Sequence, residues 1–432
     1  MIRKASFLLP FSLCAALLAA APARADRPVI DLSGARVQSY PLALAPPLGA
    51  AEPGRAVMDV LAADLDRSGL FRLLDPNSFL ADPREGTEPK KIDFSRWMTV
   101  GAQGLVKAVA SVEGDKVQVE FHLYDPARGA EQMHGTYSAP SAGQRQIAHR
   151  FADDLVRFFT QEPGDFQTRI AYVRETESGK QIVVADSDGY GTQPLTGTAI
   201  NLLPAWTPDG NGIAFTTFRD GAAHVYLVDA LSRAVRPLVL MGDFATGATY
   251  TPDGRRFAFS ASVQDNTDVY LSSAAGAAPR RLTDSKAIDI SASFSPDGKQ
   301  IAFISDRAGS PQVYVMDADG SHQRRLTFQG NYNQEPAWSP KGDLIAFSGR
   351  DEHRSFDIYT VQLPSGKVTR LTQNAGTNEK PAWSPNGRHL LFASTRSGKR
   401  QVWQMTADGH NPRQITNEKV GASDPAWGPL PR

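Results

Sequence analysis

Cysteine is almost absent from this sequence: the 432-residue chain contains one, Cys14. It lies in an apolar stretch close to the N-terminus, and Leu13 precedes it where a lipoprotein attachment site requires a small residue. Beyond residue 14 the sequence therefore excludes disulfide bonds, thiolate metal sites and a cysteine nucleophile.

A surplus of either charge is also missing, because 46 Lys and Arg residues balance 46 Asp and Glu residues. Proteins that bind nucleic acid draw affinity from a basic surplus that neutralises phosphates. The composition therefore argues against nucleic acid as the main partner. Hydrophobic residues make up 41% of the chain and charged residues 21%, which is typical of a globular protein with a sizeable core.

No apolar run approaches the ~20 residues that a membrane-spanning helix needs. The most apolar stretch, residues 7–21, follows Arg3 and Lys4 and precedes the small residues Ala23 and Ala25. This order of basic, apolar and small residues favours a secretory signal peptide over a membrane anchor. We predict that residues 1–25 form a signal peptide cleaved after Ala25. An exported chain without further cysteine suits a bacterial periplasm.

Catalytic motifs are lacking too. The eight histidines are scattered without metal-ligand spacing, and neither a Gly-x-Ser-x-Gly elbow nor a phosphate-binding glycine loop is present. The segments "DADG" (317–320) and "DSDG" (186–189) resemble calcium loops, but they lack the remaining spaced ligands and are better explained as hairpin turns. We predict no catalytic, cofactor-binding or metal-binding residues.

What the sequence does contain is a repeat centred on an aromatic residue and a proline. Its prolines stand at 208, 252, 296, 340, 385 and 429, a period of 44 or 45 residues. A fixed period of this length indicates a solenoid or a propeller. The copies are "PAWTPDG" (204–210), "ATYTPDG" (248–254), "ASFSPDG" (292–298), "PAWSPKG" (336–342), "PAWSPNG" (381–387) and "PAWGP" (425–429).

Four short β-rich runs fill each period, with Asp-Gly and Asn-Gly turns between them. We name them strand A ("PAW"), strand B ("IAF"), strand C ("QVYVM") and strand D ("RRLT"), from the axis outward. Four strands in about 44 residues predict a β-propeller blade. The series starts with strand B at "RIAYV" and ends with strand A at "PAWGP". We therefore expect six blades, with the C-terminal strand completing the first blade and closing the ring.

The strand connections predict two different faces. The A–B and C–D turns are tight, whereas the B–C and D–A loops are longer and polar. We expect binding residues on the long-loop face, where strand A begins at the channel mouth. The tryptophans of strand A are expected in the core between blades, because Tyr250 and Phe294 replace them in two copies. Four carboxylates just before strand A leave open either a Ca²⁺ site at the mouth or ion pairs with a partner: Asp289, Glu335, Glu379 and Asp424.

Residues before the repeats predict a small α/β domain. Apolar spacing indicates helices over residues 51–69 and 141–160, and strands over "LFRLLD" and over two runs joined at Glu113–Asp115. We predict an N-terminal α/β domain over residues 26–163, whose residues 26–37 form a flexible partner-binding segment, and a six-bladed propeller over residues 164–432. Residues 26–48 read as extended and interrupted by proline.

The order of signal peptide, α/β domain with "LFRLLDP", junction "TRIAYV" and six "PAW…IAF…RRLT" repeats resembles the TolB family over the whole chain. The resemblance implies a non-enzymatic periplasmic hub of the Tol–Pal system, a monomer within a complex, that supports outer-membrane integrity and constriction during cell division. It implies that the propeller mouth binds the lipoprotein Pal and that the mature N-terminus engages TolA. Other outer-membrane or peptidoglycan-associated proteins, and colicins in some members, are further implied partners.

By position, the resemblance assigns residues to both partners. Pal contacts are expected from Leu202, Leu203, Phe244, Ala245, Thr246, Asp289, Ile290, Ser291, Asn333, Gln334, Glu335, Asn378, Glu379, Lys380 and Asp424. TolA contacts are expected from Asp26, Arg27, Pro28, Val29, Ile30 and Asp31.

Two alternatives remain open at the level of sequence. A propeller hydrolase or lyase would need a nucleophile or a metal cluster at the mouth. A glycan-binding propeller would need exposed aromatic residues in the long loops, where only Phe328, Tyr332 and Phe356 qualify.

Overall fold

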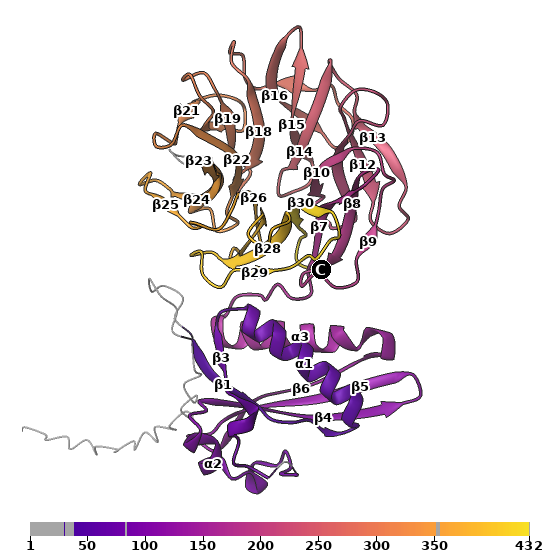
Figure 1. Cartoon of the computed structure of the whole chain (residues 1–432), viewed down its shortest axis with the longest axis vertical. Helices are drawn as coiled ribbons and strands as arrows, with labels where there is room; N and C mark the ends of the chain where they lie inside the picture. The colour runs from indigo at the N-terminus through magenta and orange to yellow at the C-terminus, as the bar shows by residue number, and fades with distance from the viewer. Residues whose placement is uncertain (1–29, 31–38, 83, 351–354, 432) are drawn as a thin grey trace, which may run out of the picture.

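The computed structural model describes residue 30 and residues 39–82, 84–350 and 355–431. An α/β unit at the N-terminal side stacks against a six-bladed β-propeller (Figure 1). Both parts of the predicted fold class are therefore confirmed. The predicted signal peptide lies outside the described residues.

The α/β unit is one sheet covered on one face by two long helices. The sheet has the order β3-β1-β4-β5-β6, with β2 beside β4. Its strand β1 is parallel to β3 and β4, and the pairs β4–β5 and β5–β6 are antiparallel. The elements are β1 (Tyr40–Leu44), β2 (Leu48–Gly49), α1 (Ala51–Arg67), β3 (Phe71–Leu73), α2 (Phe94–Thr99), β4 (Gly104–Glu113), β5 (Lys116–Asp125), β6 (Ala130–Pro140) and α3 (Gln144–Thr160).

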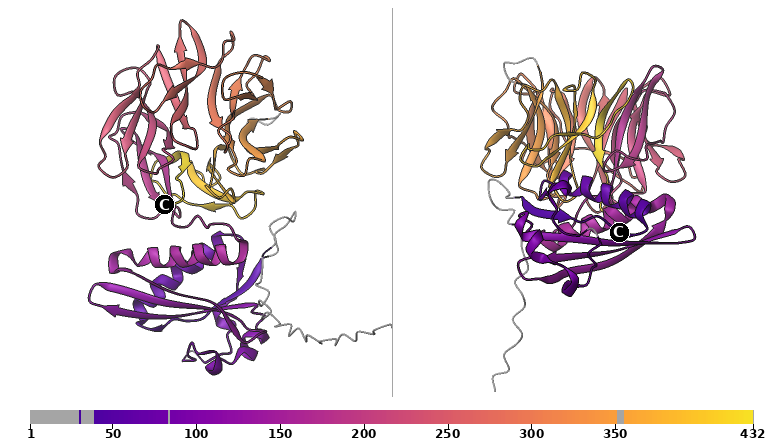
Figure 2. Two further views of the ribbon diagram at one scale, coloured as in Figure 1. Left: turned by 180° about the vertical axis from the view of Figure 1, so that it is seen from behind. Right: turned by 60° about the horizontal axis from the view of Figure 1, so that its bottom comes forward.

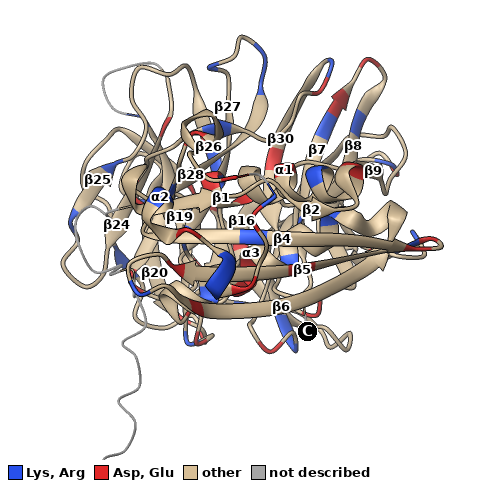
Figure 3. Ribbon diagram, turned by 90° about the horizontal axis from the view of Figure 1, so that it is seen from below, with Lys and Arg blue, Asp and Glu red and all other residues tan. Residues whose placement is uncertain are grey.

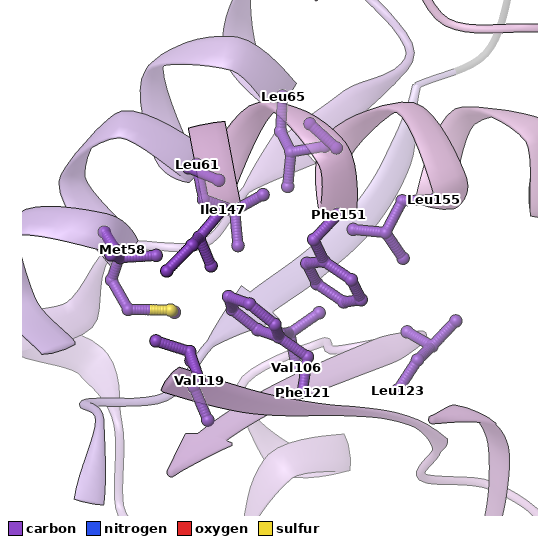
Figure 4. Packing of buried hydrophobic residues seen from close by; sticks show 14 of the residues in the cluster. Met58, Leu61, Leu65, Val106, Val119, Phe121, Leu123, Ile147, Phe151 and Leu155 are labelled. Carbon is purple, nitrogen blue, oxygen red and sulfur yellow. The ribbon is translucent and has the colours of Figure 1, made fainter. Parts of the chain in front are cut away.

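Apolar periodicity explains how this core forms. Alternate residues of β5, including Val119 and Phe121, are fully buried toward the helices. On α1, Leu61 and Leu65 are one turn apart and face the same core. Phe121 stacks on Phe151 of α3 with ring centroids 4.0 Å apart, at the centre of the cluster drawn in Figure 4.

Sequence reasoning missed four elements of this unit, of which the two-residue strand β2 is the shortest. Tyr40–Leu44, expected to be extended and interrupted by proline, is the parallel strand β1 between β3 and β4. Proline cannot donate to a strand ladder, but Pro41 stands at the start of β1, one residue before the pairing with β4 begins at Leu42 and Gly104. The edge strand β6 and the short helix α2 were also not predicted, since β6 alternates polar and small residues without a strong apolar face.

Six four-stranded antiparallel sheets form the propeller within the described residues. Five of them are continuous in sequence, in the order A to D. These strands are β10 (Asn201–Trp206), β11 (Gly212–Thr217), β12 (His224–Asp229), β13 (Val235–Val239); β14 (Phe244–Tyr250), β15 (Arg256–Val263), β16 (Asn266–Ser273), β17 (Arg280–Arg281); β18 (Asp289–Phe294), β19 (Gln300–Ser305), β20 (Gln312–Asp317), β21 (Arg324–Arg325); β22 (Tyr332–Trp338), β23 (Leu344–Arg350), β24 (Asp357–Gln362), β25 (Val368–Arg370); β26 (Asn378–Trp383), β27 (His389–Ser394), β28 (Gln401–Thr406) and β29 (Arg413–Gln414).

The sixth blade joins the two ends of the propeller sequence. Its order is β30-β7-β8-β9, with β7 (Arg169–Thr176), β8 (Gly179–Asp186), β9 (Gln193–Pro194) and β30 (Gly421–Trp427). Strand β30 is antiparallel to β7, and Trp427 is opposite Ile170. The predicted closure is confirmed, and the strand pairing removes two edges that would otherwise be exposed.

The strand A tryptophans lie between blades, as the sequence predicted. Trp338 packs against Ala302 and Val313 of the preceding blade. The indole of Trp383 donates to the backbone carbonyl of Ala337, one blade back, at 2.9 Å. Each indole thus joins two neighbouring blades.

The α/β unit docks on the face of the propeller that carries the A–B and C–D turns. Helices α1 and α3 lie between the sheet and the propeller (Figure 2). Lys341, in an A–B turn, pairs with Glu162 at 3.1 Å, and Asn386 in another donates to the Pro163 carbonyl at 3.1 Å. The long-loop face therefore remains free of the α/β unit.

Asp153 of α3 holds the connection between the two parts. Its carboxylate accepts hydrogen bonds from the backbone N–H groups of Phe166 and Gln167, at 2.9 and 3.2 Å. Burial raises the pKa of Asp153 from 3.8 to about 6, although these hydrogen bonds act in the opposite direction.

The protonated form of Asp153 is thus favoured in the folded state. Between pH 4 and 6 the folded chain binds more protons than the unfolded chain, so this contribution to stability is present at low pH and lost as the pH rises. We expect a loss of about 3 kcal/mol across this window. A carboxyl NMR titration should give a midpoint near 6 for Asp153; a midpoint below about 5 would contradict the assigned burial.

Candidate functional site at the propeller mouth

Strand A contains a β-bulge in every blade. The pairing of each strand A with its strand B shifts register near the middle of strand A. At each shift one residue adopts a left-handed backbone, with φ between 46° and 61°. We call these the axial residues: Leu203, Gly247, Ser291, Glu335, Lys380 and Asp424.

The axial residues surround a cavity of about 210 Å³ on the propeller axis. All six line it, together with the prolines and alanines that follow them. A left-handed backbone is costly for residues other than glycine, and such outliers concentrate at ligand-binding and switch sites. Its recurrence in all six blades indicates that the bulge is an architectural feature that turns one side chain per blade toward the axis.

The axial ring is chemically asymmetric. Leu203, Gly247 and Ser291 form an uncharged half, and the other three axial residues form a charged half. In the charged half, the Lys380 ammonium lies 2.7 Å from Glu335 Oε1 and 3.2 Å from Asp424 Oδ1. Burial alone would lower the pKa of Lys380, but the charges of Asp424 and Glu335 outweigh it and raise this pKa above its ordinary value.

Further hydrogen bonds fix the charged half in place. Glu335 Oε2 accepts from the backbone N–H of Lys380 at 2.9 Å and from the Ser348 hydroxyl at 2.7 Å. Glu379, next to the axial position, pairs with Arg400 at 3.2 Å. Burial, together with the charge of Glu335, raises the pKa of Glu379. The charged half is therefore held rigidly before any partner arrives.

Of the four carboxylates expected around the mouth, only Glu335 and Asp424 line the cavity. Asp289 is fully buried and pairs with Arg307 at 2.9 Å. Lys380 already supplies the positive charge between the two axial carboxylates. The described residues therefore present no unoccupied set of ligands for the Ca²⁺ that the sequence left open at the mouth.

Several expected partner-binding residues have structural partners instead. The Asn333 and Asn378 side chains are buried, and each donates a hydrogen bond to strand C of the preceding blade, to Gln312 at 2.9 Å and to Asp357 at 3.0 Å. Ala245 is fully buried as well. Half-buried side chains in this segment of strand A are Leu202, Phe244, Thr246, Ile290 and Gln334.

Exposed apolar side chains surround the mouth, and of these sequence reasoning singled out only Phe328. All six D–A loops lie in the described residues, and five of them carry a large apolar residue that is at least 41% exposed. Such exposure on one face is typical of a protein-binding surface. A signal was present in the sequence: a lone apolar residue in a polar loop ahead of strand A. These loop residues are Ile200, Leu240, Ile288, Phe328 and Val420.

The aromatic residues that could stack on a glycan already contact other side chains of the protein. Tyr332 and Phe356 contact each other edge to face at 5.6 Å, and the Arg350 guanidinium lies over both rings. Phe328 is 73% exposed, and the guanidinium of Arg325 lies 5.0 Å from its ring centre. The loops thus offer single apolar contacts rather than a stacking platform.

The expected N-terminal segment is described at one residue. Ile30 is 7% exposed in the helix–sheet core, and its N–H donates to the Phe159 carbonyl at 3.0 Å. The other five, Asp26, Arg27, Pro28, Val29 and Asp31, lie outside the described residues.

Outside the mouth, two groups in the described part of the chain bring three potential metal-ligand atoms within 4.8 Å of one another. One group is Glu120, His122 and His134; the other is His149, Asp186 and Asp188. Sequence spacing did not predict either group. Among the described residues, no helix has both the length and the apolar character of a bilayer span.

Comparison with known proteins assigns both parts of the chain. Residues 28–132 match the family described as "TolB amino-terminal domain", and residues 156–431 match "TolB beta propeller domain". "Tol-Pal system protein TolB" of Anaeromyxobacter dehalogenans (strain 2CP-C) is 45% identical over 233 residues, 52% of this chain and 54% of that one. The protein of the same name from Myxococcus xanthus (strain DK1622) is 44% identical over 207 residues, 47% and 48% of the two chains. The chain thus matches about half the length of these relatives.

Among solved structures, TolB from Acinetobacter baumannii superimposes with a TM-score of 0.81 at 27% identity. The match covers 93% of this chain and 100% of that chain, so the α/β unit and the propeller are both included.

Proposed function

The chain belongs to the TolB family, and from this premise we propose that it is a periplasmic binding hub of the Tol–Pal envelope system. The relatives are named as components of that system, and the family is not one of enzymes. In this proposal the propeller mouth binds the lipoprotein Pal, and the mature N-terminal segment binds TolA. The hub then supports outer-membrane integrity and constriction during division.

One observation supports the mouth as the Pal site: the long-loop face combines a polar axial cavity with a surround of exposed apolar side chains. An apolar surround excludes water, while rigid charges at the centre select a complementary partner. Docking of the α/β unit on the opposite face leaves this surface accessible. The six axial residues, with Glu379 and the exposed loop residues, are the proposed contacts.

The N-terminal segment is proposed to act separately from the mouth. Ile30 packs into the core of the α/β unit, so a partner bound to this segment would pull directly on that core. The α/β unit in turn contacts the propeller through Arg67 and Glu162. These contacts provide a physical connection by which the two partner sites can influence each other.

Binding of purified partners tests both assignments. We expect Glu335→Ala with Glu379→Ala to weaken capture of the soluble part of Pal by about tenfold or more, since both carboxylates are rigidly placed at the mouth. Capture of TolA should be unchanged in this variant and lost when residues 26–37 are deleted. A matched control is Glu52→Ala with Glu113→Ala, two exposed glutamates of the α/β unit. Unchanged Pal capture by the mouth variant would contradict the mouth assignment.

A further inference from the structure

The outer face of the α/β sheet carries a group of histidine and glutamate side chains. Glu120 and His122 project from β5 on the side opposite Phe121, and His134 of β6 is the register partner of His122. The two imidazole rings are stacked with centroids 4.9 Å apart. Figure 3 views the molecule from below, with β4, β5 and β6 crossing the front.

His122 is held in a definite orientation by a fourth residue. Its Nδ1 is 2.6 Å from Glu131 Oε1. A carboxylate can only accept a hydrogen bond, so Nδ1 carries the proton and the Nε2 lone pair is left free. A carboxylate that orients the far side of an imidazole is the usual support of a metal-binding histidine.

The free nitrogen of His122 has no hydrogen-bond partner. Its Nε2 is buried without one, and the residue is only 8% exposed. Glu120 Oε1 lies 3.3 Å from this nitrogen and presents another lone pair. Two lone pairs facing each other in a buried place are unfavourable unless a proton or a metal ion lies between them.

The distances from Glu120 to the two imidazole nitrogens suit a tetrahedral metal, and all three atoms lie within 4.8 Å of one another. Zn²⁺ binds imidazole nitrogen and carboxylate oxygen at about 2.0–2.1 Å, which places neighbouring ligand atoms about 3.3 Å apart in a tetrahedron. Glu120 Oε1 lies 3.3 Å from His122 Nε2 and 3.0 Å from His134 Nε2. Because the side chains of Glu120 and His134 are 42% and 51% exposed, water can reach the fourth position.

We propose that Glu120, His122 and His134 form a binding site for a divalent transition metal of the Zn²⁺ type, oriented by Glu131. Two imidazoles and one carboxylate favour such a metal over Ca²⁺ and Mg²⁺, which prefer all-oxygen ligands. Lys107 is the cross-strand neighbour of His122 on β4. Its ammonium does not oppose the positive charge of a bound metal, since it pairs with Glu85 at 2.9 Å. The site links β5 to the edge strand β6, and its metal would strengthen their pairing.

Calorimetric titration of the metal-free full chain with ZnCl₂ tests the proposal. We expect one equivalent of Zn²⁺ to bind, and a rise in the unfolding temperature with it. His134→Ala removes an exposed ligand without disturbing the core and should weaken binding at least 100-fold. Glu131→Gln, which keeps all three ligands, should weaken it about 10–100-fold. Neither CaCl₂ nor MgCl₂ should bind with comparable affinity.

The control variant is His410→Ala, which removes an exposed histidine 3.1 Å from Asp408 with no second histidine beside it. It should bind Zn²⁺ as the unaltered chain does. Absence of Zn²⁺ binding would overturn the proposal. So would binding that persists unchanged in His134→Ala and in His122→Ala, because the metal would then occupy another place, such as His149, Asp186 and Asp188.

Discussion

Replacing Arg67 with alanine is expected to lower the free energy of unfolding by about 3–5 kcal/mol. Arg67 is 6% exposed at the end of α1, where the α/β unit meets the propeller. Its guanidinium donates to the Ser187 carbonyl at 2.8 Å, to the Gln404 side chain at 3.3 Å and to Asp64 at 3.1 Å. One side chain thus connects both parts of the molecule.

The size of this effect comes from the groups that Arg67→Ala leaves behind. Asp64 is 1% exposed, so removing its cationic partner leaves a buried carboxylate that water cannot reach. The Ser187 carbonyl loses its donor as well, and an unsatisfied buried acceptor costs about 1–3 kcal/mol. The remaining partner of Asp64 is His149 at 2.6 Å, which compensates for only part of the loss.

Denaturant unfolding followed by circular dichroism measures this effect. Arg55→Ala is the matched control: it lies on the same helix, and its pair with Glu52 at 3.6 Å is largely exposed. Exposed pairs contribute about 0–1 kcal/mol, so the control should unfold almost as the unaltered chain does. Equal stability of the two variants would mean that the interface does not depend on Arg67.

If the mouth binds Pal as proposed, Lys380→Glu is expected to weaken that binding by about 30-fold or more, which corresponds to 2 kcal/mol or more. The change takes the net charge of the six axial residues from −1 to −3. Glu335 and Asp424 then lose the ammonium between them and face a third carboxylate across the cavity. A partner selected by the present charge pattern meets repulsion at the centre of the surface.

Two further variants separate charge from packing in this experiment. Lys380→Met keeps the length of the side chain without the charge and should give an intermediate loss. Lys299→Glu reverses an 81% exposed lysine in an A–B turn, on the face away from the mouth, and should leave Pal binding unchanged. Binding constants are measured by calorimetry, and thermal unfolding checks that each variant is folded. A Lys380→Glu protein that is folded and binds within about threefold of the unaltered chain would contradict a role for the axial charge.

Most of the architecture was predictable because it depends on local patterns. A constant period of 44 or 45 residues, with four β-rich runs and a glycine turn in each, specifies a blade wherever it occurs. Even ring closure followed from the half-repeat offset between "RIAYV" and "PAWGP". The strand β1 was missed because its burial comes from the neighbours β3 and β4, which lie 30 and more residues further along the chain.

The positions of site residues within the mouth were less predictable. Asn333 and Asn378 stand two residues before the axial Glu335 and Lys380, and sequence position alone assigned all four to the mouth. The β-bulge separates them, since it turns the axial residue toward the channel and leaves the asparagine inside the blade. A bulge is a property of strand pairing and has no reliable local signal.

By itself the sequence determined the order of the two parts, the number of blades and the face on which binding is expected, because each depends on residues close together in the chain. The tertiary structure alone decided which side chains meet. The pairing of Lys380 with Glu335 and Asp424 joins three blades, Arg67 joins both parts, and His122 meets His134 only through the register of β5 and β6. Such contacts depend on strand register and docking, which long-range packing sets and no local pattern records.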